Sequence, residues 1–339
     1  MEKTPFLKYD IYIYIYTDFR EGVKAMSQNK DYAFVVDSTT ALNKDVTDAV
    51  RVEKVSLSIT VENLNKPENE WTSEEIAQAL KENKNVHSAC PSPAEFAQAY
   101  EKLFDEGYKD ILVLPMNKSI SHTYESAVMG RQVLDEEKQK HVVVLELFEA
   151  NYGLALLVMV LAKYSEQGFT FEQMVAKAKE IAPTFHECWT LSTLEPLYKG
   201  GRLSRFSFIV GAFLKIKPII GINETKGSLE AEKKVRTFND VDKYFLDKIA
   251  EAMNKFKHVY MSFVHMGEDD LTNNLIKKVS DLYPDLDYTV FDGVGPLFTV
   301  HLGDAGYGIG FIGEGLKNEN PTNKEESIPT KIMKLFKKD

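Results

Sequence analysis

An α/β fold of two domains is expected from the length of the chain, its composition and the order of its apolar segments. The chain has 339 residues, and at about 150 residues per domain this length predicts two domains. Hydrophobic residues make up 44% and charged residues 27%, which is typical of globular proteins and argues against wholesale disorder. From residue 32 onward, short apolar runs alternate with helix-like segments, which favours a mainly parallel sheet with helices on both faces.

The elements of the first half follow this alternation. The run YAFVV reads as a buried strand that ends at Asp37, Thr72 is placed to cap a helix, and Gly107 closes the next helix. We expect strands at 32–37, 55–61, 110–116 and 141–148, and helices at 73–83, 91–107, 120–134 and 153–168.

The second half has a different order of elements, which predicts a mixed sheet with helices. The run ETKG at 224–227 resembles a hairpin turn between two strand-like runs within 215–238. We expect further helices at 169–185, 240–255 and 272–283, strands at 187–194, 258–265 and 286–291, and a Gly-rich end at 293–313. The predicted parts are an extra N-terminal segment (1–31), an N-terminal α/β domain (32–183), a C-terminal α/β domain (184–316) and a charged tail (317–339).

Charge and cysteine content exclude several classes of protein. The formal net charge is −10, which disfavours binding to a nucleic acid backbone because phosphates require a basic surface. Only Cys90 and Cys188 are present, so neither a disulfide scaffold nor a four-cysteine zinc site is expected. The seven histidines are scattered without paired spacing, and we therefore expect no metal site.

No segment is long enough to predict a membrane span or a signal peptide. The longest apolar run, at 153–162, has ten residues and suits a buried helix. The N-terminal YIYIYI alternates with a strand period, and no small-residue cleavage site follows it. A soluble, cytoplasmic protein is expected.

Hydroxyl side chains cluster at two predicted strand-to-helix junctions. Ser88 and Ser92 lie at the first junction, and Ser119, Ser121 and Thr123 lie at the second. Ligands of open α/β sheets bind beyond the C-terminal ends of strands, where helix N-termini favour anions. The two clusters could hold one carboxylate together, or each hydroxyl could simply cap its helix.

The other candidate residues are cations and histidines in loops. Arg202 and Arg205 follow two glycines and could pair with a carboxylate or phosphate, or lie solvated in a loop. His265 follows a predicted strand, and His301 lies in the Gly-rich end. That end has no phosphate-loop motif, and the chain has no GxSxG nucleophile motif.

Eight segments in order resemble the signature series of the DegV family. They span residues 32 to 313, most of the chain, and consist of VVDSTTAL, the SxxPSP segment, SISHTYESA, LYKGGRLSR, IKPII, KVRTF, FVH and the final GP…HLG. The resemblance implies two α/β domains that hold a long-chain fatty acid between them. It also implies a carrier that is not itself an enzyme and has no cofactor. Such a carrier presents the fatty acid carboxylate to a separate ATP-dependent fatty acid kinase and contacts membranes transiently for lipid exchange.

The resemblance also assigns roles to individual residues. Ser88 and Ser121 correspond to the hydroxyl donors for the carboxylate, and His265 to a histidine near the head group. Arg202 corresponds to the arginine of a Gly-Gly-Arg motif and, with Arg205, is expected to face the head group or the kinase. The residues expected near the same cleft are Asp37, Ser38, Ser92, Thr123 and His301.

Three departures from the family pattern keep other functions open. The family's Thr-Ser-Gln is Ser88-Ala89-Cys90 here, and a glycine of its Ser-Gly-Thr-Tyr motif is His122. Its second Asp-Ser element is replaced within 149–153. One alternative is a diverged paralogue that acts as a lipid-dependent interaction or regulatory protein. Another is an acyl hydrolase that uses Ser121 with His265 or His122.

Overall fold

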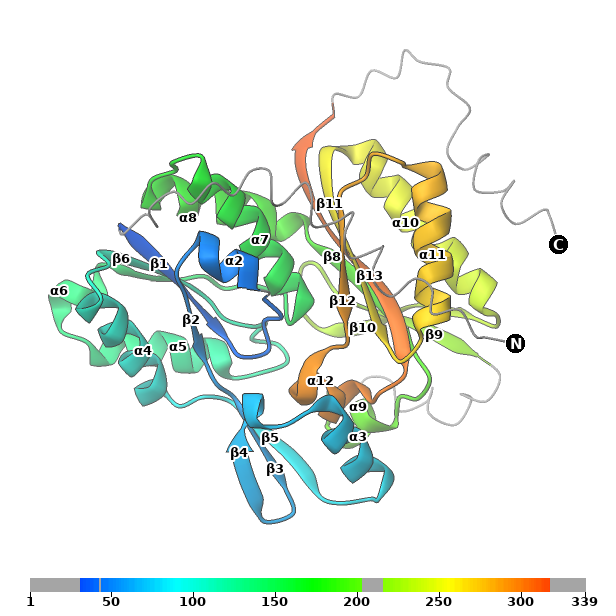
Figure 1. The fold of residues 1–339 in the computed structure, drawn as a ribbon, viewed down its shortest axis with the longest axis horizontal. Coiled ribbons are helices and arrows are strands. Elements are labelled where there is room, and N and C mark those ends of the chain that lie inside the picture. The colour runs from blue at the N-terminus through cyan, green and yellow to red at the C-terminus, as the bar shows by residue number, and fades with distance from the viewer. Residues whose placement is uncertain (1–30, 43, 203–215, 318–339) are drawn as a thin grey trace, which may run out of the picture.

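A parallel four-stranded sheet forms the first layer of the molecule. The computed structural model describes residues 31–42, 44–202 and 216–317 (Figure 1). The strands β1 (Tyr32–Asp37), β2 (Val52–Val55), β6 (Asp110–Leu114) and β7 (Val142–Val144) are arranged in the order β2-β1-β6-β7. Helices α4 (Pro93–Asp105) and α5 (Thr123–Val133) cover one face, and α2 (Lys44–Ala49) and α7 (Tyr152–Glu166) cover the other. The predicted parallel sheet with helices on both faces is confirmed.

A separate three-stranded antiparallel sheet projects from this layer. It consists of β3 (Ser58–Val61), β4 (Leu64–Pro67) and β5 (Val86–Ala89) in the order β4-β3-β5. The single strand expected at 55–61 is wrong, because β2 ends at Val55 and β3 belongs to this other sheet. The helical pieces η1 (Glu68–Glu70) and α3 (Ser73–Lys81) follow β4, and Thr72 caps α3 as expected. A short helix, α6 (Glu136–Gln139), lies between α5 and β7.

The second large layer is a mixed six-stranded sheet. Its order is β10-β9-β8-β13-β11-β12, in which only β11 and β12 are parallel neighbours. The strands are β8 (His186–Leu191), β9 (Lys217–Ile222), β10 (Leu229–Val235), β11 (Phe256–Met266), β12 (Tyr288–Asp292) and β13 (Gly306–Leu316). Helices α10 (Phe238–Lys255) and α11 (Asp269–Leu282) pack on its outer face, as Figure 1 shows. The predicted hairpin of β9 and β10 is confirmed.

Helix α7 packs between the two large sheets. Its run of apolar residues is buried on all sides, from Leu154 to Ala162. It shares one hydrophobic cluster with residues of the parallel sheet, such as Phe34, and of the mixed sheet, such as Val264 and Ile312. It also contacts β11 and β13 directly. A single hydrophobic core therefore joins both halves of the chain, which explains why this segment is apolar all round. The domain boundary near residue 183 stays a prediction.

Four further helical elements complete the described fold. Helix α8 (Phe171–Ile181) and η2 (Ala182–Thr184) lead into β8, and α9 (Glu195–Lys199) follows β8. The Gly-rich end contains a helix, α12 (Gly295–Leu302), that packs against α3, β5 and α9. Within the described ranges, no helix combines the length and the apolar character that crossing a bilayer requires. Residues 1–30 of the predicted N-terminal segment, residues 318–339 of the predicted tail and Arg205 lie outside the described residues.

Candidate functional site

A cavity of about 630 Å³ lies where the three sheets approach one another. Its walls come from β5, the loop after β6, β8, the end of α9, the β9–β10 hairpin and α12. A cavity of this volume is within the range that accommodates drug-sized ligands. The polar side chains that line it include Ser88, Ser121, Arg202 and His301, and the apolar ones include Leu57, Met116, Trp189, Leu197, Ile222, Leu229, Leu297, Phe298 and Leu302.

Ser88 and His301 form a hydrogen bond across the cavity wall. Ser88 Oγ on β5 lies 3.0 Å from His301 Nε2 on α12. Burial, with a smaller contribution from Arg202, lowers the pKa of His301 to about 4, so the imidazole is neutral near pH 7. Its Nδ1 is buried and has no hydrogen-bond partner among the described residues. Gly200 makes room for the ring, because a Cβ there would lie 2.9 Å from His301 Nδ1.

Ser121 lies just before the start of α5. Its hydroxyl is 2.8 Å from Thr123 Oγ1 and accepts a hydrogen bond of 3.3 Å from the Thr123 backbone N–H. Thr123 itself is fully buried behind Ser121. The positive end of the α5 dipole therefore lies beside the cavity, which favours an anionic group there.

Arg202 contributes a positive charge to the lining of the cavity. Its Nη1 donates to the carbonyl of Gly200 at 2.6 Å, and its Nε lies 3.5 Å from the carbonyl of Ile120. These contacts hold the guanidinium between the end of α9 and the loop that carries Ser121. The remaining N–H groups of the guanidinium can still donate hydrogen bonds to an anion in the cavity.

Asp37 and Ser38 support the cavity from behind. Asp37 is fully buried and accepts hydrogen bonds from the backbone of Thr39 at 3.1 Å and of Met116 at 2.7 Å. Ser38 accepts from the backbone N–H of Leu57 at 3.0 Å and donates to Glu68. Both residues thus hold backbone groups of residues that line the cavity, Met116 and Leu57.

Glu68 is a buried residue that the sequence reasoning missed. Its carboxylate accepts from Ser38 and, at 3.2 Å, from the backbone N–H of Leu297 at the start of α12. Burial raises its pKa to about 7. Glu68 therefore connects the end of β1 to the helix that carries His301. The residues around Glu68 are polar and mostly exposed, so the sequence pattern does not indicate this role.

His265 and Ser92 lie away from the lining of this cavity. The Nδ1 of His265 lies 3.0 Å from Asp269 and its Nε2 lies 3.7 Å from Asp292, since strand alternation turns the ring toward α11. The position of His265 near a head group stays a prediction. Ser92 caps α4 by accepting from the Glu95 backbone N–H at 3.3 Å.

The residues that depart from the family pattern lie at the cavity. Ala89, Cys90 and His122 line it, and so does Ala150 of the altered 149–153 segment. The His122 ring is largely exposed and lies 3.9 Å from Glu125. These substitutions therefore change the cavity lining itself.

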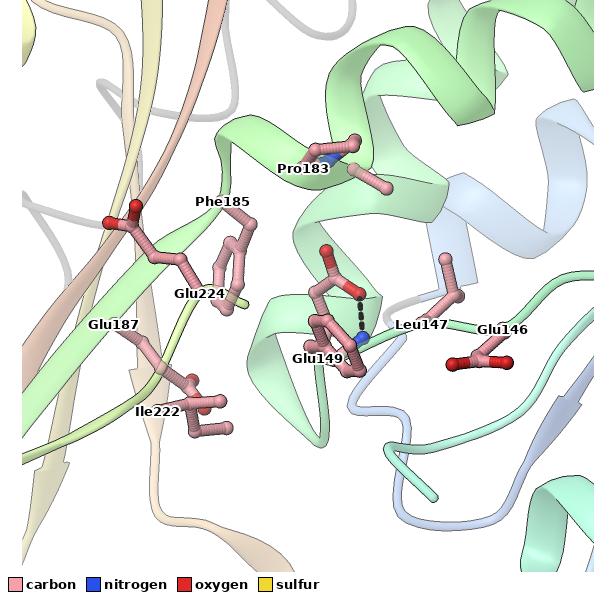
Figure 2. A pocket seen from close by; sticks show the side chains of 10 residues that line it. Glu146, Leu147, Glu149, Pro183, Phe185, Glu187, Ile222 and Glu224 are labelled. Atoms are coloured by element: carbon pink, nitrogen blue, oxygen red, sulfur yellow. Dashed lines mark hydrogen bonds between the residues drawn. The ribbon is translucent and has the colours of Figure 1, made fainter. Parts of the chain in front are cut away.

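A second cavity of about 120 Å³ lies beside the first, and Glu187 and Ile222 line both. Figure 2 shows the side chains of Glu149 and Phe185 between Glu187 and Ile222 on one side and Leu147 on the other. Glu149 accepts from the Phe148 backbone N–H at 2.9 Å. Burial raises the pKa of Glu149 to about 7 and that of Glu187 well above its ordinary value. Burial therefore favours the uncharged form of Glu187 at the cavity wall.

Comparisons with known proteins agree on one family. The family model described as "Uncharacterised protein, DegV family COG1307" matches residues 31–314. A DegV domain-containing protein of Staphylococcus aureus (strain COL) is 25% identical over 276 residues, which cover 81% of this chain and 96% of that protein. A fatty-acid-binding DegV family protein from Thermus thermophilus superposes with a TM-score of 0.74 at 24% identity, covering 84% of this chain and 99% of that one.

A second solved structure shows the same fold. A stearic-acid-binding protein from Eubacterium ventriosum superposes with a TM-score of 0.73 at 20% identity, covering 84% of this chain and 98% of that one. The family model spans most of the chain, and both superpositions cover nearly all of the compared structures. The chain belongs to the DegV family.

Proposed function

We propose that this chain binds a long-chain fatty acid in the 630 Å³ cavity, with the carboxylate at Ser88, Ser121, His301 and Arg202. The observation that carries the proposal is the division of the lining into a polar group of residues and a larger apolar group. An amphipathic ligand with one anionic end fits such a lining. The fatty-acid-binding proteins from T. thermophilus and E. ventriosum support it through their shared fold.

The polar residues suit a carboxylate in particular. An ionised carboxylate that is removed from water must be paired or hydrogen-bonded. Ser88 and Ser121 can each donate an O–H to the carboxylate, and Arg202 supplies the positive charge. Neutral His301 can donate its Nε2–H to Ser88 Oγ, which leaves the Ser88 proton free for the ligand. The hydroxyl–imidazole bond at 3.0 Å fixes the Ser88 side chain before ligand arrives, which reduces the ordering cost of binding.

The apolar residues suit a hydrocarbon tail. Burying the roughly 14 methylenes of a 16-carbon acid is favourable by about 11 kcal/mol at 0.8 kcal/mol each. Part of this is offset by the lost freedom of the chain. Burial raises the pKa of Glu187 well above its ordinary value, which favours an uncharged carboxyl in the wall that the tail would contact.

We propose further that the chain is a carrier that presents the carboxylate to a separate ATP-dependent fatty acid kinase, which forms the acyl phosphate. The resemblance of LYKGGRLSR to the family motif supports a partner surface around Arg202, where the guanidinium lies at the polar part of the cavity. Loading of the cavity would then require transient contact with a membrane or another lipid source. A regulatory protein that needs the same bound lipid is the alternative, and it predicts lipid binding without phosphorylation.

The contacts of the histidines argue against the acyl hydrolase. The Ser121 hydroxyl pairs with Thr123, while His122 and His265 have Glu125 and Asp269 as neighbours. Ser88 and His301 are in hydrogen-bond reach, but a pKa of about 4 makes His301 a weak base. Its Nδ1 also has no orienting carboxylate among the described residues, which a nucleophile–base pair requires.

Displacement of a fluorescent fatty acid by palmitate tests the proposal. Ser121→Ala and Ser88→Ala should each weaken binding by roughly 10-fold, because a hydrogen bond to a charged group contributes about 1.5–3 kcal/mol. Ser92→Ala is the matched control, since Ser92 caps α4 outside the cavity. Equal affinity in all four proteins would refute the assignment. Adding fatty acid kinase and ATP to the loaded chain then separates the carrier from the regulatory protein by the formation of acyl phosphate.

A further inference from the structure

Three side chains with metal-binding chemistry converge on the outer face of the mixed sheet. His186 and Cys188 are alternate residues of β8 and therefore point to the same face. Glu232 comes from β10, two strands away in the sheet. One ligand atom from each residue lies within 4.8 Å of the others, and His186 Nε2 is 3.7 Å from Glu232 Oε2. Glu187 and Trp189 point to the opposite face and line the cavity, so this cluster is a separate site.

The backbone is shaped to let Glu232 reach β8. The pairing of β10 with β9 shifts register between Ala231 and Lys233, which marks a β-bulge at Glu232. A bulge redirects a side chain. Gly221 of β9 lies between Cys188 and β10, and a Cβ at this position would collide with the Glu232 carboxylate. The missing side chain of Gly221 thus leaves the space that Glu232 crosses.

Neighbouring groups hold the cluster in an orientation suited to an ion. His186 Nδ1 lies 3.2 Å from Glu224 Oε1, and the Tyr244 hydroxyl donates to Glu232 at 2.6 Å. A carboxylate on the far nitrogen is the usual support of a metal-bound histidine. His186 is only 7% exposed, and its Nε2 has no hydrogen-bond partner among the described residues. With Nδ1–H donating to Glu224, the Nε2 lone pair is directed at Cys188 and Glu232.

We propose that His186 Nε2, Cys188 Sγ and a Glu232 carboxylate oxygen bind a Zn²⁺ ion, with water in the fourth position. A nitrogen, a thiolate and a carboxylate are the ligand types of zinc, whereas a thiolate disfavours Mg²⁺ and Ca²⁺. Ligands at zinc distances of 2.0–2.3 Å in a tetrahedron are about 3.5 Å apart, so the widest pair must close by about 1 Å. This site escapes sequence reasoning because one His-x-Cys pair is not a zinc motif, and the third ligand, Glu232, comes from a different strand.

Zinc binds a cysteine as the thiolate, so the Cys188 thiol must release its proton to solvent when the ion enters. Lys248 of α10 is a neighbouring cation, and its ammonium lies 3.3 Å from Glu251. Zinc is expected to compete with this ammonium for the Glu232 carboxylate.

The ion would join β8 to β10 across β9. The turn of the β9–β10 hairpin is held by Asn117, which donates to the Gly227 carbonyl at 2.7 Å, and Ile222 and Leu229 of the hairpin line the large cavity. Zinc is therefore expected to stabilise the folded chain and the hairpin wall of the cavity, because it binds the folded state preferentially.

Titration of the chelator-treated, full-length chain with ZnCl₂ against a chromophoric chelator tests the site. We expect one zinc per chain and a rise in Tm. Cys188→Ala and His186→Gln should abolish both effects, and Glu224→Gln should weaken binding by about 10-fold. Cys90→Ala and His141→Gln are the controls, because Cys90 is an exposed thiol and His141 forms a His–carboxylate pair with Asp110 at 2.9 Å.

Cobalt provides a readout that does not depend on a variant that may misfold. CoCl₂ added to the wild-type chain should produce a thiolate-to-cobalt charge-transfer band in the near ultraviolet, and ZnCl₂ should remove it. Zinc binding that persists in Cys188→Ala, or that is lost in Cys90→Ala, would overturn the proposal. So would the absence of the band at one equivalent of cobalt.

Discussion

Ser88 and His301 are 213 positions apart in the chain and 3.0 Å apart in space. The bond connects the small antiparallel sheet, through β5, to α12 near the end of the described fold. This bond therefore fixes the polar residues on β5 and α12 relative to one another, and the proposed binding of the carboxylate depends on it.

Replacing His301 should impair ligand binding, whereas replacing His265 should not. His301→Phe removes the hydrogen bond that orients the Ser88 hydroxyl toward the carboxylate, so palmitate should bind roughly 10-fold more weakly. His265→Phe is the matched control, since its ring lies against Asp269 outside the cavity lining. Titration calorimetry of both variants measures the difference. A larger loss in the His265 variant would support the role that the sequence assigned to that residue.

Adding a methyl group at Gly200 should act through His301. A Cβ at Gly200 would lie 2.9 Å from His301 Nδ1 and 3.1 Å from the Pro196 carbonyl, so the ring must shift away from Ser88. Gly200→Ala should therefore weaken palmitate binding by several-fold. Residues that act through one contact have non-additive effects. The Gly200→Ala, His301→Phe double variant should then bind no more weakly than His301→Phe alone; fully additive losses would show that Gly200 acts by another route.

Filling the apolar part of the cavity should select against long ligands. Leu229 lines the cavity at the start of β10 and is nearly buried. Leu229→Trp should lower affinity for an 18-carbon acid about 10-fold and affect a 12-carbon acid much less, because only the longer tail needs the lost volume. Leu64→Trp, on the exposed strand β4, is the control. Competition with a fluorescent fatty acid compares the lengths, and an equal loss for both acids would place the tail elsewhere.

The buried Glu149 should make stability depend on pH. Burial raises its pKa from 4.5 to about 7, so between these values the folded chain holds a proton that the unfolded chain has lost. The free energy of unfolding should therefore decrease as the pH rises from about 4.5 to about 7. Glu149→Gln should remove this contribution. The free energy of unfolding of the variant, relative to that of the wild type, should therefore be about 2 kcal/mol higher at pH 8 than at pH 5.

Urea unfolding at both pH values measures the effect of Glu149. Glu146→Gln is the control, because Glu146 is well exposed and paired with Lys118 at 2.7 Å. A pH dependence that is the same in Glu149→Gln as in the wild type would show that another buried acid, such as Glu187, dominates it.

Most of the fold was predictable because local patterns determined it. The alternation of apolar runs with helices gave the parallel sheet, and ETKG gave the β9–β10 turn. The small sheet was missed because β4 is exposed, polar and ends in Pro67, so it carries no strand period. The helix α12 was missed because two glycines and a proline at its start resemble a loop.

The candidate site was predictable only in part, because its contacts join distant segments. Motif resemblance selected Ser88, Ser121 and Arg202, which the structure brings to one cavity. His265 and His301 were both candidates. Successive side chains of β11 point to opposite faces of the sheet, so His265 faces α11 while Val264 and Met266 lie on the inner face. His301 shares one face of α12 with Leu297, Phe298 and Leu302, which a loop reading of that segment could not reveal.

Mass spectrometry of the purified, full-length chain under native and denaturing conditions shows directly whether the cavity holds a fatty acid. We predict a single, stoichiometric adduct with the mass of a long-chain fatty acid, present in the native spectrum and lost on denaturation. The chain-length preference would follow from the same mass. A native spectrum without such an adduct, which stays unchanged after incubation with a mixture of fatty acids, would contradict the proposal that the cavity holds a fatty acid.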